Sequence, residues 1–166
     1  MKLDKDYNQL KVDCFHKSLL GDIYKSLGQM NTTGNFFTDE NEANRELCTC
    51  LKLLGHDAIY DFRNLGRPID IFADNSIIEG KLEPNNVGID RLIGQISDFL
   101  TYNCHIYIVC YGATEQRTLD RIKTQIVDLH PHRINLVYLF NSQRSRGKLT
   151  PEDLSYLNKQ YIKGLD

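Results

Sequence analysis

Apolar residues in the first third of the chain recur at helical spacing. The pattern predicts an amphipathic helix over residues 7–28. A second helix is expected to begin after Thr38 or Asp39, either of which is a good N-cap, and to run to Leu54, where Gly55 ends it. The apolar face of this second helix would carry Ala43, Leu47, Leu51 and Leu54.

The period changes after residue 55. Three short β-rich runs cover residues 56–63, 68–73 and 76–82, and turn-forming residues separate them, which predicts three consecutive antiparallel strands. The elements expected after them are a helix over 89–102, a buried strand over 105–111, a helix over 114–129, a buried strand over 134–140, a basic loop and a last helix that Pro151 opens.

This order of elements predicts an α/β domain with a mixed central sheet and helices on both faces, because a strand meander is followed by strand-helix-strand crossovers. The 166 residues fit one domain. We divide it into an N-terminal helical extension (1–35), a core (38–140) and a C-terminal loop and helix (141–166).

Composition narrows the class of protein. Hydrophobic residues make up 41% of the chain and charged residues 25%, as in ordinary globular domains. No apolar run approaches the roughly 18 residues that span a bilayer, and the polar start is unlike a signal peptide. We therefore expect no membrane association and an intracellular, cytoplasmic location. The five cysteines are an odd number, so reduced thiols are expected.

The segment with the strongest chemical signal runs from Arg67 to Lys81. Asp70 lies near the start of one expected strand, and Glu79 and Lys81 lie near the end of the next, across a tight turn. Glu79 and Lys81 are two residues apart and share a strand face. The hairpin therefore brings two carboxylates and one ammonium together at one end of the sheet.

The residues around these charges are mostly apolar, so the charges are expected to be partly buried. Two buried carboxylates beside one lysine are costly unless a cation joins them. Mg²⁺ is held by one or two carboxylates and completes its shell with water and substrate phosphate oxygens, which suits this pair. The sequence therefore predicts a Mg²⁺ or Mn²⁺ site at Asp70 and Glu79.

The same residues resemble the PD-(D/E)XK nuclease superfamily. Pro68-Ile69-Asp70 departs slightly from its Pro-Asp motif, while Glu79-Gly80-Lys81 is the full Glu-x-Lys form. The segment QISDF (95–99), on the helix after the third strand, is similar to the Q-x-x-x-Y motif of the RecB-type branch, with Phe99 in place of the tyrosine. The resemblance covers residues 38–140, including the αβββαβ order of the restriction-endonuclease-like core.

The resemblance implies a Mg²⁺-dependent deoxyribonuclease that leaves a 5′-phosphate. Asp70, Glu79 and the Gly80 carbonyl would ligate the metal. Lys81 would orient or deprotonate the attacking water or stabilise charge in the transition state. Gln95 would position the substrate or an active-site carboxylate.

The family often adds a glutamate from the helix before the sheet, and three candidates are present. Glu40 is in phase with the apolar face of the expected helix. Glu42 is favoured by length, since about 13 helical residues match the roughly 20 Å between the end of the helix and Asp70. Glu46, nearer the far end of the helix, ranks third.

Two alternatives stay open. The acids can form a solvated strand rim, or the chain can be a catalytically inactive nuclease-fold module that binds DNA or assembles a complex. The net charge of −2 requires any phosphate-binding surface to be local, with Arg144, Arg146 and Lys148 as candidates. It also favours weak DNA binding by a single chain, and so a homodimer or a protein partner.

Overall fold

The computed structural model describes residues 18–30, 39–63, 66–82 and 84–141. Five strands form one sheet in the order β1-β2-β3-β4-β5. Neighbours from β1 to β3 are antiparallel, whereas β3, β4 and β5 are parallel, so the sheet is mixed, as the sequence predicts. The strands are β1 (Ala58–Phe62), β2 (Ile69–Ala73), β3 (Ser76–Leu82), β4 (His105–Thr114) and β5 (Ile134–Asn141).

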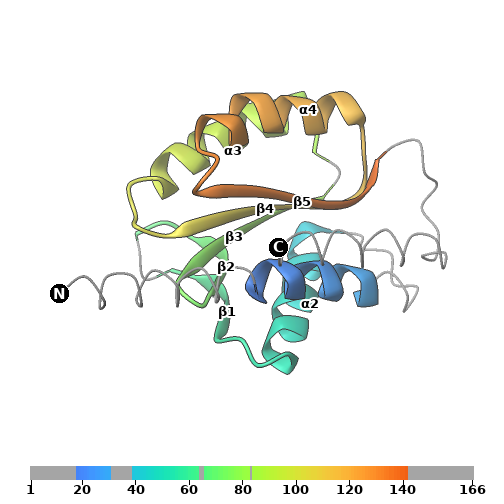
Figure 1. Cartoon of the computed structure of the whole chain (residues 1–166), viewed down its shortest axis with the longest axis vertical. Coiled ribbons are helices and arrows are strands. Elements are labelled where there is room, and N and C mark those ends of the chain that lie inside the picture. Colours follow the sequence, from blue (N-terminus) through green and yellow to red (C-terminus); the bar gives the residue numbers. More distant parts are fainter. Residues whose placement is uncertain (1–17, 31–38, 64–65, 83, 142–166) are drawn as a thin grey trace, which may run out of the picture.

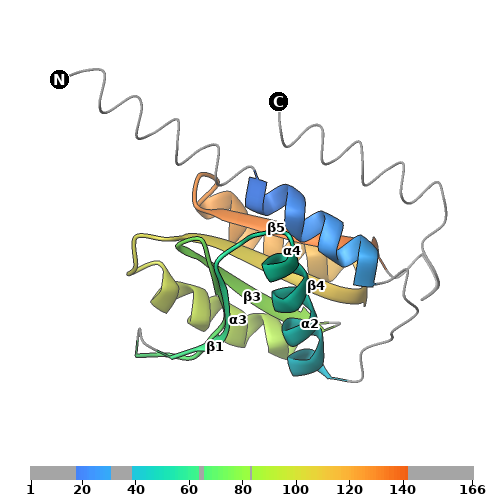
Figure 2. The ribbon, with the colours of Figure 1, turned by 90° about the horizontal axis from the view of Figure 1, so that it is seen from below.

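Helices cover both faces of this sheet (Figure 1). The helix of residues 18–30 and α2 (Glu40–Leu53) lie on one face, and α3 (Asn86–Phe99) and α4 (Gln116–Gln125) lie on the other, with a short 3-10 helix, η1 (Val127–Leu129), after α4. Figure 2 shows the helix of residues 18–30 and α2 from below. The α/β architecture with helices on both faces is therefore confirmed.

Each face has its own apolar layer. Leu19 and Ile23 of the first helix pack with Leu47 and Leu51 of α2 against the inner residues of the strands. On the other face, α3 and α4 bury a second layer that includes Leu92 and Ile122. Because both faces are buried, the strands read as nearly continuous apolar runs, and charged side chains within them are exceptional.

Capping side chains set the ends of two helices. Asp39 is the N-cap of α2, and its Oδ1 accepts a hydrogen bond from the Glu42 amide at 2.7 Å. Asn85 caps α3 in the same way, and its Oδ1 accepts from the Gly88 amide at 2.9 Å. α3 therefore begins at Asn86, three residues before the expected residue 89. It ends at Phe99, before the expected residue 102. The expected helix over 114–129 is shorter, because β4 extends to Thr114.

The turn between β2 and β3 positions the hairpin. Asp74 and Asn75 both have positive φ, as a two-residue type I′ turn requires. The Asp74 carboxylate accepts from the Asp57 amide at 3.0 Å and contacts His56 Nδ1. The other ring nitrogen of His56 lies 2.6 Å from Asp22 Oδ2, which connects the first helix to the hairpin turn.

Several expectations fall outside the described residues. They are the first part of the helix predicted over 7–28, the basic loop with Arg144, Arg146 and Lys148, and the last helix. Among the helices in the described ranges, none combines the length and apolar character needed to cross a membrane.

Candidate functional site

The β2–β3 hairpin opens where the predicted site residues lie. Its ladder pairs Ile71 with Ile78 and stops there. Beyond this pair, the Gly80 amide donates to Asp70 Oδ2 at 2.9 Å, so a side chain replaces the backbone partner. Because the N–H and C=O of one strand residue point to the same neighbouring strand, the Gly80 carbonyl also faces the opening.

Glu79 and Lys81 form a close ion pair at this end of β3. They alternate with Ile77 and share its face of the sheet, which α3 and α4 cover. Lys81 Nζ donates to Glu79 Oε1 at 2.8 Å, and the Glu79 side chain is only 2% exposed against 12% for Lys81. The pair is therefore removed from solvent, and the interpretation of these acids as a solvated strand rim is not supported.

The helix carboxylate comes from Glu40. Its Oε2 accepts from the Leu82 amide at 3.1 Å, and its Oε1 lies 3.6 Å from Lys81 Nζ. Glu42 is exposed in the first turn of α2. Glu46 lies about one turn further along, where it raises the pKa of the Cys50 thiol, although burial raises that pKa more. Helical phase thus selects Glu40. This residue lies on the α2 face that packs on the sheet, so its carboxylate reaches the end of β3.

The structure adds two residues that the sequence analysis missed. Asn44, one turn after Glu40, is fully buried, and its Oδ1 accepts from the Tyr111 hydroxyl at 2.8 Å. A Cβ on Gly80 would lie 1.9 Å from that Oδ1, so only glycine fits beside Asn44. The sequence signal for Asn44 was a polar residue among the apolar positions of α2. Tyr111 gave no such signal, because a tyrosine is ordinary in a buried strand.

Burial is the largest influence on the pKa of both acids. Burial raises the pKa of Asp70, against the lowering effect of the Gly80 amide and of Lys81. Burial and then the neighbouring Asp70 raise the pKa of Glu79 to about 7. Burial opposes the charge on Lys81, but the surrounding carboxylates outweigh it and raise the pKa of Lys81.

The donor set fits a divalent cation only as an open site. Within the described residues, no group of three or more His, Cys, Asp or Glu side chains is arranged to hold a metal ion by itself. Asp70 and Glu79 with the Gly80 carbonyl supply three oxygens, and water or substrate would supply the others, which is the usual way that Mg²⁺ is bound. The acids crowded around one lysine leave negative charge that such an ion would neutralise.

Gln95 is placed on α3, with its Oε1 buried and without a hydrogen-bond partner among the described residues. This oxygen is available to a ligand or to water, and among the described residues no hydrogen bond from Oε1 joins Gln95 to the acids. Its position on the helix after β3 is the one that the sequence predicts.

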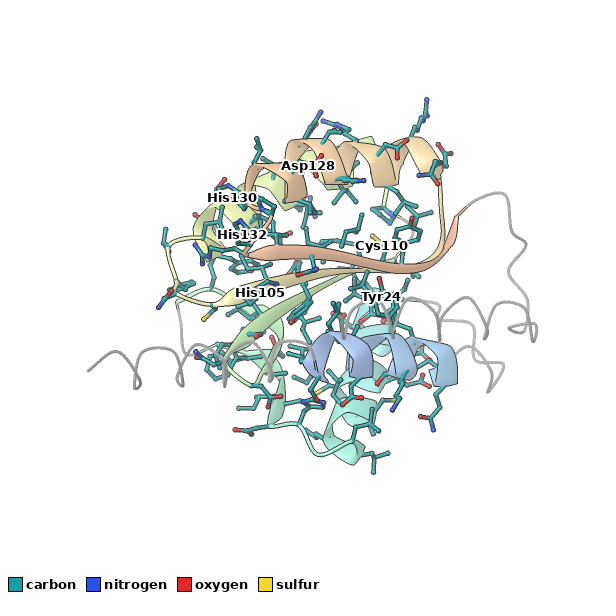
Figure 3. The ribbon with its side chains drawn as sticks, in the orientation of Figure 1. Tyr24, His105, Cys110, Asp128, His130 and His132 are labelled. Carbon is teal, nitrogen blue, oxygen red and sulfur yellow. The ribbon has the colours of Figure 1, made fainter. Side chains whose placement is uncertain are left out.

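The structure also places the cysteines and histidines that the described residues include. Burial raises the pKa of Cys110 to about 12, so this thiol, the register partner of Lys81, is inert. The described cysteines are free, and no two of them form a disulfide. Figure 3 shows His130 and His132 toward the opposite end of the sheet from Cys110.

Comparison with protein-family models, with curated proteins and with solved structures finds no match to this chain. The functional argument therefore depends on the residues of the site.

Proposed function

We propose that this chain is a divalent-metal-dependent nuclease with a restriction-endonuclease-like core, which hydrolyses DNA phosphodiester bonds. The observation that carries the proposal is the meeting of Asp70, Glu79, Lys81 and Glu40 at the open end of one hairpin. The order α2-β1-β2-β3-α3-β4 also supports it, since it matches the αβββαβ order that the motif implies.

Each residue takes a role that its position favours. Asp70, Glu79 and the Gly80 carbonyl would hold Mg²⁺ or Mn²⁺, which when bound supplies Lewis-acid activation of water and of the phosphate. Lys81, whose ammonium is shared by Glu79 and Glu40, keeps Glu79 in place and donates to an anionic phosphate oxygen. In the hydrolysis, the water oxygen bonds to phosphorus and releases a proton to solvent, the P–O3′ bond breaks, and the departing 3′ oxygen takes up a proton to leave a 3′-hydroxyl and a 5′-phosphate.

The test is a cleavage assay on linear, circular, single-stranded and branched DNA with Mg²⁺, Mn²⁺ or EDTA. The wild-type protein should cleave at least one substrate with metal and none in EDTA. Asp70→Asn and Glu79→Gln should abolish cleavage, and the matched control Asp90→Asn, which breaks an exposed pair with Arg121, should not. Cleavage in EDTA contradicts the metal mechanism, and DNA binding without any cleavage favours the inactive module.

A further inference from the structure

Asn44 is an unusual residue for the place it occupies. It is 0% exposed and stands among the buried residues of α2, next to Ala43 and one turn before Leu47 and Cys48. Its Nδ2 has no hydrogen-bond partner in the part of the chain that the structure describes. A buried donor without a partner costs roughly 1–3 kcal/mol, so packing alone does not account for an amide at this position.

The Tyr111 hydroxyl fixes the direction of this amide. Tyr111, also buried, donates to Asn44 Oδ1 at 2.8 Å, which leaves the amide nitrogen on the other side. Asn44 Oδ1 adjoins Gly80, whose amide donates to Asp70 Oδ2 at 2.9 Å, so the Asn44 amide lies beside the Asp70 carboxylate. The Asn44 side chain also lowers the pKa of that carboxyl, after the larger effects of burial, the Gly80 amide, Lys81 and Glu40. The nitrogen is therefore directed at an anionic neighbour rather than at the core.

Gly80 makes this arrangement possible. Any Cβ there would lie 1.9 Å from Asn44 Oδ1 and 2.6 Å from Tyr111 Cε2, and the Gly80 amide itself holds Asp70 Oδ2. Asp70 thus has one donor from β3 and a second donor group beside it from α2. The helix that supplies Glu40 also supplies Asn44 one turn later, on the same side.

We infer that Asn44 is a positioning residue that orients the Asp70 carboxylate for metal binding and is itself held by the Tyr111 hydroxyl. The inference rests on the function proposed above. Metal-bound carboxylates need such outer partners, and their removal weakens metal binding or activity by roughly 10- to 100-fold. An amide at this buried position of α2 is explained by its place beside Asp70.

The experiment compares the wild-type chain with Tyr111→Phe and with the double variant Asn44→Leu/Tyr111→Phe. The double variant removes donor and acceptor together, so it should fold with a melting temperature equal to or above that of the wild type. Calorimetric titration with Mn²⁺ alone should show about tenfold weaker binding in the double variant and a smaller loss in Tyr111→Phe. The half-saturating Mg²⁺ concentration for cleavage should rise, with KM for DNA unchanged.

Thr114→Val is the matched control, because the Thr114 hydroxyl is also buried and unpaired within the described residues. It should leave Mn²⁺ binding unchanged. Wild-type Mn²⁺ affinity in the double variant overturns the inference while the proposed function stands. A wild-type protein that neither binds Mn²⁺ nor cleaves DNA removes the proposed function and this inference together. If the double variant does not fold, unchanged Mn²⁺ affinity in Tyr111→Phe overturns the inference.

Discussion

Lys81 Nζ lies 2.8 Å from Glu79 Oε1 in a pair whose side chains are 12% and 2% exposed. The lysine is the one cation in contact with the clustered acids among the described residues. Its charge is therefore needed most when no metal is bound, which makes the free energy of unfolding of the metal-free protein a sensitive measure of the site.

Lys81→Met should destabilise the metal-free protein. Removal of one partner of a buried ion pair lowers the free energy of unfolding by about 3–5 kcal/mol. The decrease here should be smaller, because the pKa of Glu79 is raised to about 7 and this side chain can take up a proton. Mg²⁺ should restore most of the lost stability while turnover stays low. Urea unfolding with and without Mg²⁺ measures this, with Lys123→Met on the exposed face of α4 as the control. A variant that cleaves at the wild-type rate would contradict the assigned role of Lys81.

Asp70→Asn and Glu79→Gln should have the opposite effect on the metal-free protein. Each substitution removes one of two repelling buried charges, so the melting temperature should stay equal or rise. The increase in melting temperature that Mg²⁺ gives the wild type should disappear in both variants. Differential scanning calorimetry with a Mg²⁺ series checks this, and a retained Mg²⁺ effect in either variant would remove that residue from the ligand set.

Gly80→Ala should be harmful although it adds a single methyl group. The new Cβ would meet Asn44 Oδ1 at 1.9 Å and Tyr111 Cε2 at 2.6 Å, both inside the core, so overpacking should cost roughly 1–3 kcal/mol. Gly94→Ala is the matched control. Gly94 lies on the exposed side of α3 with nothing within 4 Å of a Cβ, and alanine there should stabilise the helix by ~0.5–1 kcal/mol. Equal melting temperatures for the two variants would refute the steric argument.

Gln95→Leu should keep the fold and lose activity. Its Oε1 is buried without a partner among the described residues, so an apolar side chain of similar size leaves no new unpaired group, and stability should change by less than about 1 kcal/mol. Cleavage should fall because the amide no longer meets substrate or water. Ser97→Ala, two residues away on the exposed side of α3, is the control. A collapse of thermal stability in Gln95→Leu would make Gln95 a structural residue.

Stability should depend on pH through His56. Burial opposes the charge of this ring, but hydrogen bonds to Asp74 and Asp22 outweigh burial and raise the pKa of His56 above 6.5. Its contribution to the free energy of unfolding is therefore full below pH 6.5 and is lost as the pH rises through the raised value. Urea unfolding between pH 6 and 9 should show this decline in the wild type and a smaller one in His56→Gln.

His132→Gln, in the exposed turn before β5, is the control for this pH dependence and should keep the wild-type slope (Figure 3). An equal slope in His56→Gln and in the wild type would show that the contacts with Asp22 and Asp74 do not supply the pH-dependent stability.

Local sequence patterns predicted the type and order of the described elements and placed two acids in one hairpin. Helical period and a cap at Thr38 or Asp39 predicted α2, for which the structure shows Asp39 as the cap, and short β-rich runs separated by an Asp-Asn turn predicted the hairpin. Glu79 and Lys81 share a face through the two-residue period of a strand. These features are local, since each depends on residues within a few positions of one another.

The distant groups that complete the site are brought together by tertiary packing. Glu40 was separated from Glu42 by the packing of α2 on the sheet, which brings its carboxylate to the Leu82 amide, 42 residues away. Asn44 and Tyr111 are 67 residues apart and meet because α2 packs on β3 at Gly80, next to the strand β4 that carries Tyr111. Helical phase ranks Glu40 first among the three glutamates, but contacts between distant residues depend on how the layers stack, which a periodic pattern in one sequence does not specify.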